Sequence, residues 1–93
     1  ALAQLRIHDP ERYGRYMSHF MPVLTKYNGK LLAADNAPHV LEGEWWDRNK
    51  VVLLQFEDVA AFRAWGSSPE YIEIAEDRKA GADAVVLLIN GVG

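Results

Sequence analysis

Eight residues near the middle of the chain, KVVLLQFE at positions 50–57, carry the strongest strand signal in the sequence. Apolar side chains occupy both alternating faces of this run, whereas a strand with one face in water alternates between apolar and polar residues. We therefore predict that residues 50–57 lie in the centre of a sheet and that the other elements are arranged around them.

A helix is predicted for residues 9–27, because its start, its periodicity and its end are all marked. Asp9 offers an N-cap, and Pro10 suits the first helical position. Apolar and aromatic side chains then recur at helical spacing, so that one face of the helix is apolar. Pro22 lies within this stripe and is expected to kink the helix without ending it. The Asn-Gly pair at positions 28–29 ends the helix and permits a left-handed cap.

A second helical region falls into two pieces. Asp58 is expected to cap the first piece, which ends at Gly66, and Ser68 with Pro69 starts the second, which runs to about residue 80. The strands are predicted at residues 1–7, 30–35, 50–57 and 82–91, with HVLEGEWW (39–46) continuing the second strand as an extended arm.

This order of elements, β-α-β-β-α-β, predicts a ferredoxin-like α+β fold for residues 1–93 as a single domain. In that fold four antiparallel strands lie in the order 4-1-3-2, and both helical segments cover one face of the sheet. The opposite face is left bare.

Composition and charge exclude several classes of function. The net charge is −3 and there is no cysteine, so we expect no nucleic-acid or anionic-membrane partner, no disulfide and no thiolate chemistry. The longest apolar run, AVVLLI at 84–89, is far shorter than the ~20 residues that span a bilayer. We expect a cytoplasmic protein that has lost a few initial residues, because the chain starts within a predicted strand. His8, His19 and His39 show no helical pairing, so neither a metal site nor a cofactor is predicted.

Strand alternation sorts side chains between the two faces of the sheet. On residues 1–7 the apolar set, which includes Leu5, suits the helices, so that Gln4 and Arg6 point to the bare face. On residues 50–57 Val52 and Leu54 belong with the helices. The bare face then carries apolar side chains mixed with a polar patch, which is typical of a surface that associates with a second copy of the chain.

The same alternation divides HVLEGEWW. His39 and Trp45 fall on one side, and Glu42 falls on the other, provided that Gly43 does not introduce a bulge. If Glu42 shares the bare face with Arg6, the two residues are expected to form a hydrogen-bonded ion pair in an interface or a pocket.

Four short motifs occur in order along the chain: residues 9–13 (DPERY), 27–30 (YNGK), 41–45 (LEGEW), and Trp65 followed by 68–71 (SPEY). Together they resemble the domain of unknown function 1330 family, essentially end to end. Asn28 stands where that family usually has glycine, Gly66 where a tyrosine often follows the tryptophan, and Trp46 is an added ring.

The resemblance implies the dimeric α/β barrel superfamily, in which two ferredoxin-like sheets face each other. Relatives on that fold include cofactor-free antibiotic-biosynthesis-type monooxygenases, muconolactone isomerase and chlorite dismutases, so the fold does not select a reaction. A homodimer through the open sheet face is therefore expected.

Candidate site residues follow from these patterns. Glu42, flanked by apolar and aromatic residues, is a candidate general base, and its alternative role is a structural partner for Arg6. His19 is a weaker catalytic candidate, with a boundary position on its helix as the alternative. The residues expected to contact a ligand are Arg6, Tyr16, Tyr27, Trp45, Trp65 and Tyr71, although core packing is an alternative for the aromatic ones.

Two functions are consistent with the sequence. The first is a dimer that binds a small aromatic or acidic molecule, or acts on it as a cofactor-independent enzyme, with Glu42 as the base and Arg6 holding an anion. The second is a structural or regulatory dimer without catalysis, in which Glu42 and Arg6 only stabilise the interface.

Overall fold

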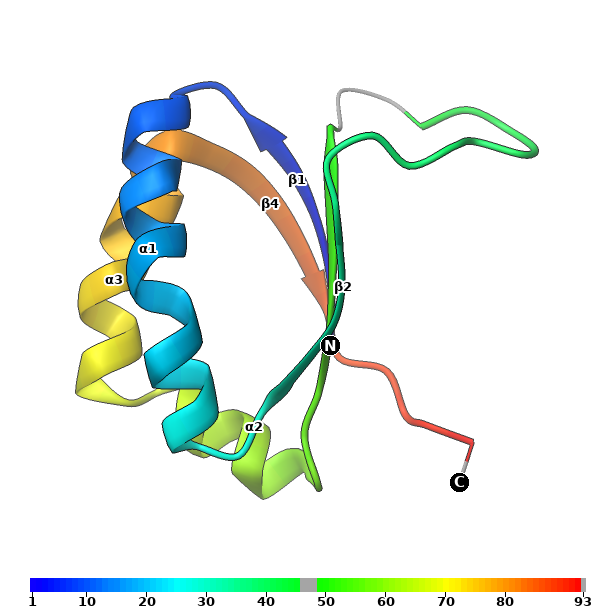
Figure 1. Ribbon diagram of the computed structural model, residues 1–93. Coiled ribbons are helices and arrows are strands. Elements are labelled where there is room, and N and C mark those ends of the chain that lie inside the picture. Colours follow the sequence, from blue (N-terminus) through cyan, green and yellow to red (C-terminus); the bar gives the residue numbers. More distant parts are fainter. Residues whose placement is uncertain (46–48, 93) are drawn as a thin grey trace.

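The computed structural model describes residues 1–45 and 49–92 and contains four strands and three helices (Figure 1). In chain order the elements are β1 (Leu2–Ile7), α1 (Pro10–Lys26), β2 (Lys30–Asp35), β3 (Lys50–Gln55), α2 (Val59–Gly66), α3 (Pro69–Gly81) and β4 (Ala82–Leu87).

The four strands form one antiparallel sheet in the order β2-β3-β1-β4, which is the predicted order 4-1-3-2 read from the other edge. Figure 1 shows all three helices on one side of this sheet, and the other side uncovered. The ferredoxin-like α+β prediction is therefore confirmed. As predicted, β3 is a central strand, because its two apolar faces suit a position between β1 and β2.

The three helices begin directly after the predicted capping residues. The side-chain oxygens of Asp9, Asp58 and Ser68 each accept a hydrogen bond from the backbone N–H three residues later, which satisfies a donor that the helix leaves unpaired. Helix α1 also continues through Pro22, as expected.

The left-handed residue at the end of α1 is Asn28, with φ 61°. Asparagine tolerates this conformation better than most residues. Gly29 is required for a different reason, since a Cβ there would collide with the side chains of Leu24 and Phe56.

The core lies between the helices and the sheet, and strand alternation placed its sheet side correctly. Leu5, Val52 and Leu54 are buried on the helix-facing side. From the helices, the buried hydrophobic side chains are Tyr13, Tyr16, Phe20, Leu24, Trp65 and Ala75.

Two predicted extensions of the strands are absent. Strand β4 ends at Leu87, not residue 91, because Leu87 pairs with Leu2 and no neighbouring strand lies beyond that point. Residues 38–45 form no strand. The side chain of Asp35 accepts a hydrogen bond from the N–H of Ala37 at 2.9 Å, which turns the chain away after the last paired residue of β2.

The alternation expected over residues 39–46 is therefore wrong for its described part, and Trp46 lies outside the described residues. Gly43 adopts φ 87°, a left-handed conformation that glycine favours and that a regular strand does not contain. Figure 1 shows the resulting loop projecting from the sheet on the side opposite the helices. We call residues 36–45 the projecting loop; its Leu41 side chain is 95% exposed.

Candidate functional site

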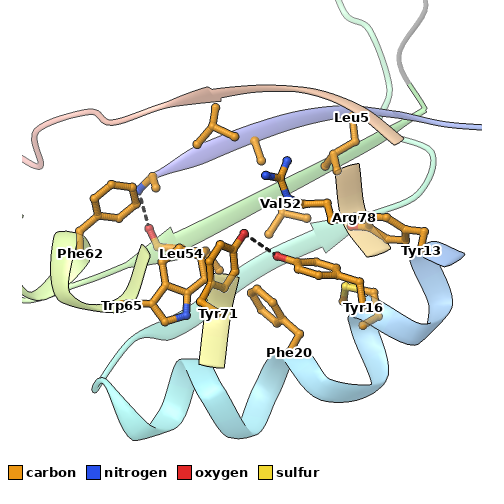
Figure 2. A pocket seen from close by; sticks show the side chains of 14 residues that line it. Leu5, Tyr13, Tyr16, Phe20, Val52, Leu54, Phe62, Trp65, Tyr71 and Arg78 are labelled. Carbon is orange, nitrogen blue, oxygen red and sulfur yellow. Dashed lines mark hydrogen bonds between the residues drawn. The ribbon is translucent and has the colours of Figure 1, made fainter. Parts of the chain in front are cut away.

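An apolar pocket of about 60 Å³ lies between the helices and the sheet (Figure 2). Aromatic rings from all three helices form one wall, and aliphatic residues of β1 and β3 form the other. The lining residues are Ala1, Ala3, Leu5, Tyr13, Tyr16, Met17, Phe20, Val52, Leu54, Phe62, Trp65, Tyr71, Arg78 and Val86.

The helical period accounts for this wall. Tyr13, Tyr16 and Phe20 on α1 are three and four residues apart, so they share one face. Residues Tyr71 and Arg78 on α3 are two turns apart and also share a face. Figure 2 shows Phe62 and Trp65 toward one end of the pocket, with Tyr13 and Arg78 toward the other.

Two tyrosine hydroxyls meet inside the pocket. The Oη atoms of Tyr16 and Tyr71 are 3.0 Å apart, which is a hydrogen bond between helices α1 and α3. The ring of Tyr71 also lies against that of Trp65, with 4.0 Å between their centroids. The hydroxyls of Tyr16 and Tyr71 therefore form a polar point in a mostly aromatic wall.

Burial shifts the acidity of the tyrosines in this wall. It raises the pKa of Tyr13 to about 12, against a smaller lowering by the nearby Arg78 guanidinium. Burial also raises the pKa of Tyr16, and the neighbouring Tyr71 adds to that increase. Both hydroxyls are therefore neutral near pH 7 and act as hydrogen-bonding groups there.

This burial predicts alkaline unfolding. Below pH 10, the ordinary tyrosine pKa, the stabilisation from buried neutral Tyr13 is fully present, and it is lost as the pH rises from 10 through about 12. The free energy of unfolding is expected to fall by up to about 1.4 kcal/mol per pH unit for such a group. Tyrosinate absorbance and circular dichroism should change together in this range, and Tyr13→Phe should move the midpoint upward. Complete tyrosine ionisation near pH 10 with helices intact would contradict the burial.

Two buried N–H groups at the pocket have no hydrogen-bond partner among the described residues. They are Nε1 of Trp65 and Nε of Arg78. Trp65 is only 5% exposed. A buried donor without an acceptor costs about 1–3 kcal/mol, so these two atoms mark positions where an acceptor would stabilise the protein.

Positive charge gathers at the Tyr13 end of the pocket. The Lys50 side chain is buried, and its Nζ lies 4.9 Å from the centroid of the Tyr13 ring. Burial lowers the pKa of this lysine. In residues 1–45 and 49–92, no carboxylate lies within ion-pair distance of Lys50 or Arg78. Asp77, which precedes Arg78 in the sequence, pairs with Arg12.

The pocket brings together three of the residues expected to contact a ligand, Tyr16, Trp65 and Tyr71. Tyr27 lies apart from the lining, and its hydroxyl donates to Glu70 at 3.2 Å. Trp45 belongs to the projecting loop and is half-buried.

Arg6 and Glu42 are not brought together in the single chain. Arg6 forms an ion pair with Asp83, its neighbour across β1 and β4, on the bare face where alternation placed it. Glu42 is exposed in the projecting loop and does not line the pocket. The proposed roles of Glu42 and Arg6 stay predictions.

His19 is exposed on α1 and lies outside the pocket lining. A catalytic role for this histidine also stays a prediction. In the part of the chain that the structure describes, no three His, Cys, Asp or Glu side chains gather to hold a metal ion.

Sequence reasoning missed Arg78 and Lys50. Arg78 follows Tyr71 and Ala75 at helical spacing, which is a signal that it shares their inward face. Lys50 has the same strand parity as buried Val52. Both signals were present, but charged residues at such positions are usually read as solvated.

The bare face of the sheet carries apolar side chains together with polar ones such as Arg6 and Asp83, and a second, open hollow of about 580 Å³ lies near the C-terminal segment. Leu32, Leu53 and residues 88–92 border it. Val85 and Leu87 on β4 are also exposed on this side. Exposed apolar side chains gathered on one face are typical of an association site.

Comparison with known proteins identifies one family. The family model described as "Domain of unknown function (DUF1330)" matches residues 1–92. No curated protein gives a significant match. None of the helices in the described residues is both long and apolar enough to cross a membrane.

Two solved structures share the fold. The RPA0582 protein of unknown function from Rhodopseudomonas palustris is 23% identical, with 96% of this chain and 83% of that chain covered and a TM-score of 0.60. SnoaB, a cofactor-independent oxygenase from Streptomyces nogalater, is 12% identical, with coverages of 98% and 92% and a TM-score of 0.63. At these identities the likeness concerns the fold.

Proposed function

The chain belongs to the domain of unknown function 1330 family, and on that premise we propose that it is a homodimer that binds a small organic molecule between its helices and its sheet. The observation that carries the binding proposal is the N–H of Trp65, which is buried at the aromatic pocket without an acceptor among the described residues. A ligand that stacks on the aromatic wall and accepts this hydrogen would satisfy both features.

The size of the pocket limits the ligand. Its volume of about 60 Å³ is below the ~150 Å³ cavity that takes benzene. A ring can enter only if side chains at the pocket move outward. Met17 and Phe62 are half-buried, so each can move toward solvent, and methionine has several low-energy conformations. We therefore propose a ligand with one small ring.

The bare face supports the homodimer. Leu2, Val51 and Leu53 lie on it beside the exposed Val85 and Leu87, so covering this face with a second sheet would remove apolar surface from water. The projecting loop extends on the same side (Figure 1) and would reach the partner.

An alternative to a catalytic role is that Glu42 and Arg6 only stabilise the interface of the proposed dimer. Both side chains are exposed on the side of the sheet opposite the helices, away from the pocket. In this alternative the two residues fix the alignment of the subunits without taking part in catalysis. SnoaB supports an enzymatic role only through the shared fold, since one fold supports many reactions.

Benzamide, a neutral single-ring amide, is a suitable probe of the pocket. We expect millimolar benzamide to shift the indole N–H resonance of Trp65 in a ¹H–¹⁵N spectrum, with the peak assigned from Trp65→Phe. The Glu42→Gln variant should bind benzamide with unchanged affinity, because Glu42 does not line the pocket. If saturating benzamide leaves the Trp65 resonance unmoved, the pocket does not bind such molecules. A loss of binding in Glu42→Gln with the dimer intact would instead place Glu42 in the site.

A further inference from the structure

The charge in the pocket is unbalanced. Among the described residues that line it, Arg78 is the one with a charged side chain, and its Nε is buried without a hydrogen-bond partner. Figure 2 shows the Arg78 side chain pointing into the pocket, between the sheet residues Leu5 and Val52 and the ring of Tyr13.

Asp77, the acidic residue next to Arg78 in the sequence, does not pair with Arg78. Asp77 accepts a hydrogen bond from Nε of Arg12 at 2.6 Å, which ties α3 to α1 outside the pocket. Buried Lys50 packs on the Tyr13 ring and adds a second cation at the same end. Arg78 is half-buried and its Nε is cut off from water, so an anion that accepts from this N–H would replace hydration that the atom has lost.

The donors at this end suit an anion. A guanidinium presents several N–H groups in a plane that matches a carboxylate, and charge-assisted hydrogen bonds are about twice as strong as neutral ones. The Tyr16 and Tyr71 hydroxyls lie between Arg78 and Trp65 in Figure 2 and can donate one further hydrogen bond. The opposite end, at Phe62 and Trp65, is mostly aromatic, and the Ala1 amino group there already donates to the Leu54 carbonyl.

We propose that the ligand of this pocket is a small organic acid, whose anionic group binds Arg78 and whose flat body packs on the Trp65 ring with an acceptor near its N–H. This assignment rests on the proposed function, because it specifies the chemistry of the molecule that occupies the same pocket. Arg78 is thereby the residue that selects acids over neutral compounds of the same shape.

Benzoate and benzamide test the assignment, because they have nearly the same shape and differ in charge. Binding of each probe to the full chain is followed at the Trp65 indole N–H at neutral pH and constant ionic strength. We expect benzoate to bind at least tenfold more tightly than benzamide. Arg78→Met, which keeps much of the side-chain volume, should remove this preference, and Arg63→Met on the exposed surface of α2 should retain it.

Each outcome decides between the two proposals. Equal affinities for benzoate and benzamide in the unaltered protein overturn the acid assignment and leave the binding pocket standing. No response to either probe overturns both. If Arg78→Met does not fold, as checked by circular dichroism, the comparison of the two probes on the unaltered protein still decides. A benzoate preference that persists in folded Arg78→Met overturns the role of Arg78.

Discussion

Replacing Leu53 by aspartate is expected to turn the proposed dimer into a monomer. Leu53 lies on the bare face of the central strand β3, where it is opposite Leu2 of β1 and Ala33 of β2. A second sheet packed on this face would bury the new carboxylate without a partner, at a cost of several kcal/mol. Since 1.4 kcal/mol is tenfold in affinity, the dimer should weaken at least about a hundredfold.

Sedimentation velocity across a range of concentrations measures this effect. Ile72→Asp is the matched control, because Ile72 is exposed on helix α3 and the substitution brings the same charge. We expect that control to remain dimeric. The dimer proposal fails if the unaltered chain is monomeric at high micromolar concentration, or if Leu53→Asp remains dimeric.

The area of the sheet face makes the projecting loop important for the proposed dimer. Four strands of six residues cover roughly 400 Å² of projected face, at ~4.8 Å between strands and ~3.3 Å per residue. A stable interface needs about 800 Å² from each partner. The projecting loop and residues 88–92 are exposed on the bare side and can supply the difference.

Leu24→Ala is expected to cause the largest loss of folding stability. Leu24 has 0% exposure and lies in the core near the end of α1. Removing its buried atoms costs about 2–5 kcal/mol, because the lost burial and the remaining cavity both count. Such a loss is a large share of the ~5–15 kcal/mol that stabilises a domain.

Thermal and urea unfolding at fixed protein concentration measure the loss. At about 4–8 °C per kcal/mol for a domain of this size, the midpoint should fall by at least ~8 °C. Met21→Ala on the same helix is the control, because the Met21 side chain is 44% exposed and should contribute within about 0.5 kcal/mol. Equal losses in the two variants would contradict the position of Leu24 in the core.

Much of the fold could be predicted from the sequence, because its signals are local. Asp9, Asp58 and Ser68 mark helix starts through hydrogen bonds that span three residues. Alternation placed Leu5 and Val52 on the correct face, since side chains of a paired strand must alternate. In the projecting loop, alternation failed because a strand also requires a partner, and no described strand pairs with residues 38–45.

The candidate site could be predicted only in part. Periodicity placed Tyr16 and Tyr71 on inward faces, but not the meeting of their hydroxyls, which depends on how α1 packs against α3. Arg78 is important because no carboxylate among the described residues forms an ion pair with it. Its acidic neighbour Asp77 pairs with Arg12, sixty-five residues away in sequence, and no local pattern reveals that choice.

Strand β4 lies at the edge of the sheet, so aggregation through this edge can compete with formation of the proposed dimer. An edge strand presents a row of unpaired backbone N–H and C=O groups, on which another chain can add as a further strand. Residues 84–89, AVVLLI, have no charge and no proline, which is the composition of segments that form fibrils. Packing of two bare faces, as in the proposed dimer, would bury the exposed side chains of Val85 and Leu87 in this segment and so lower its tendency to aggregate.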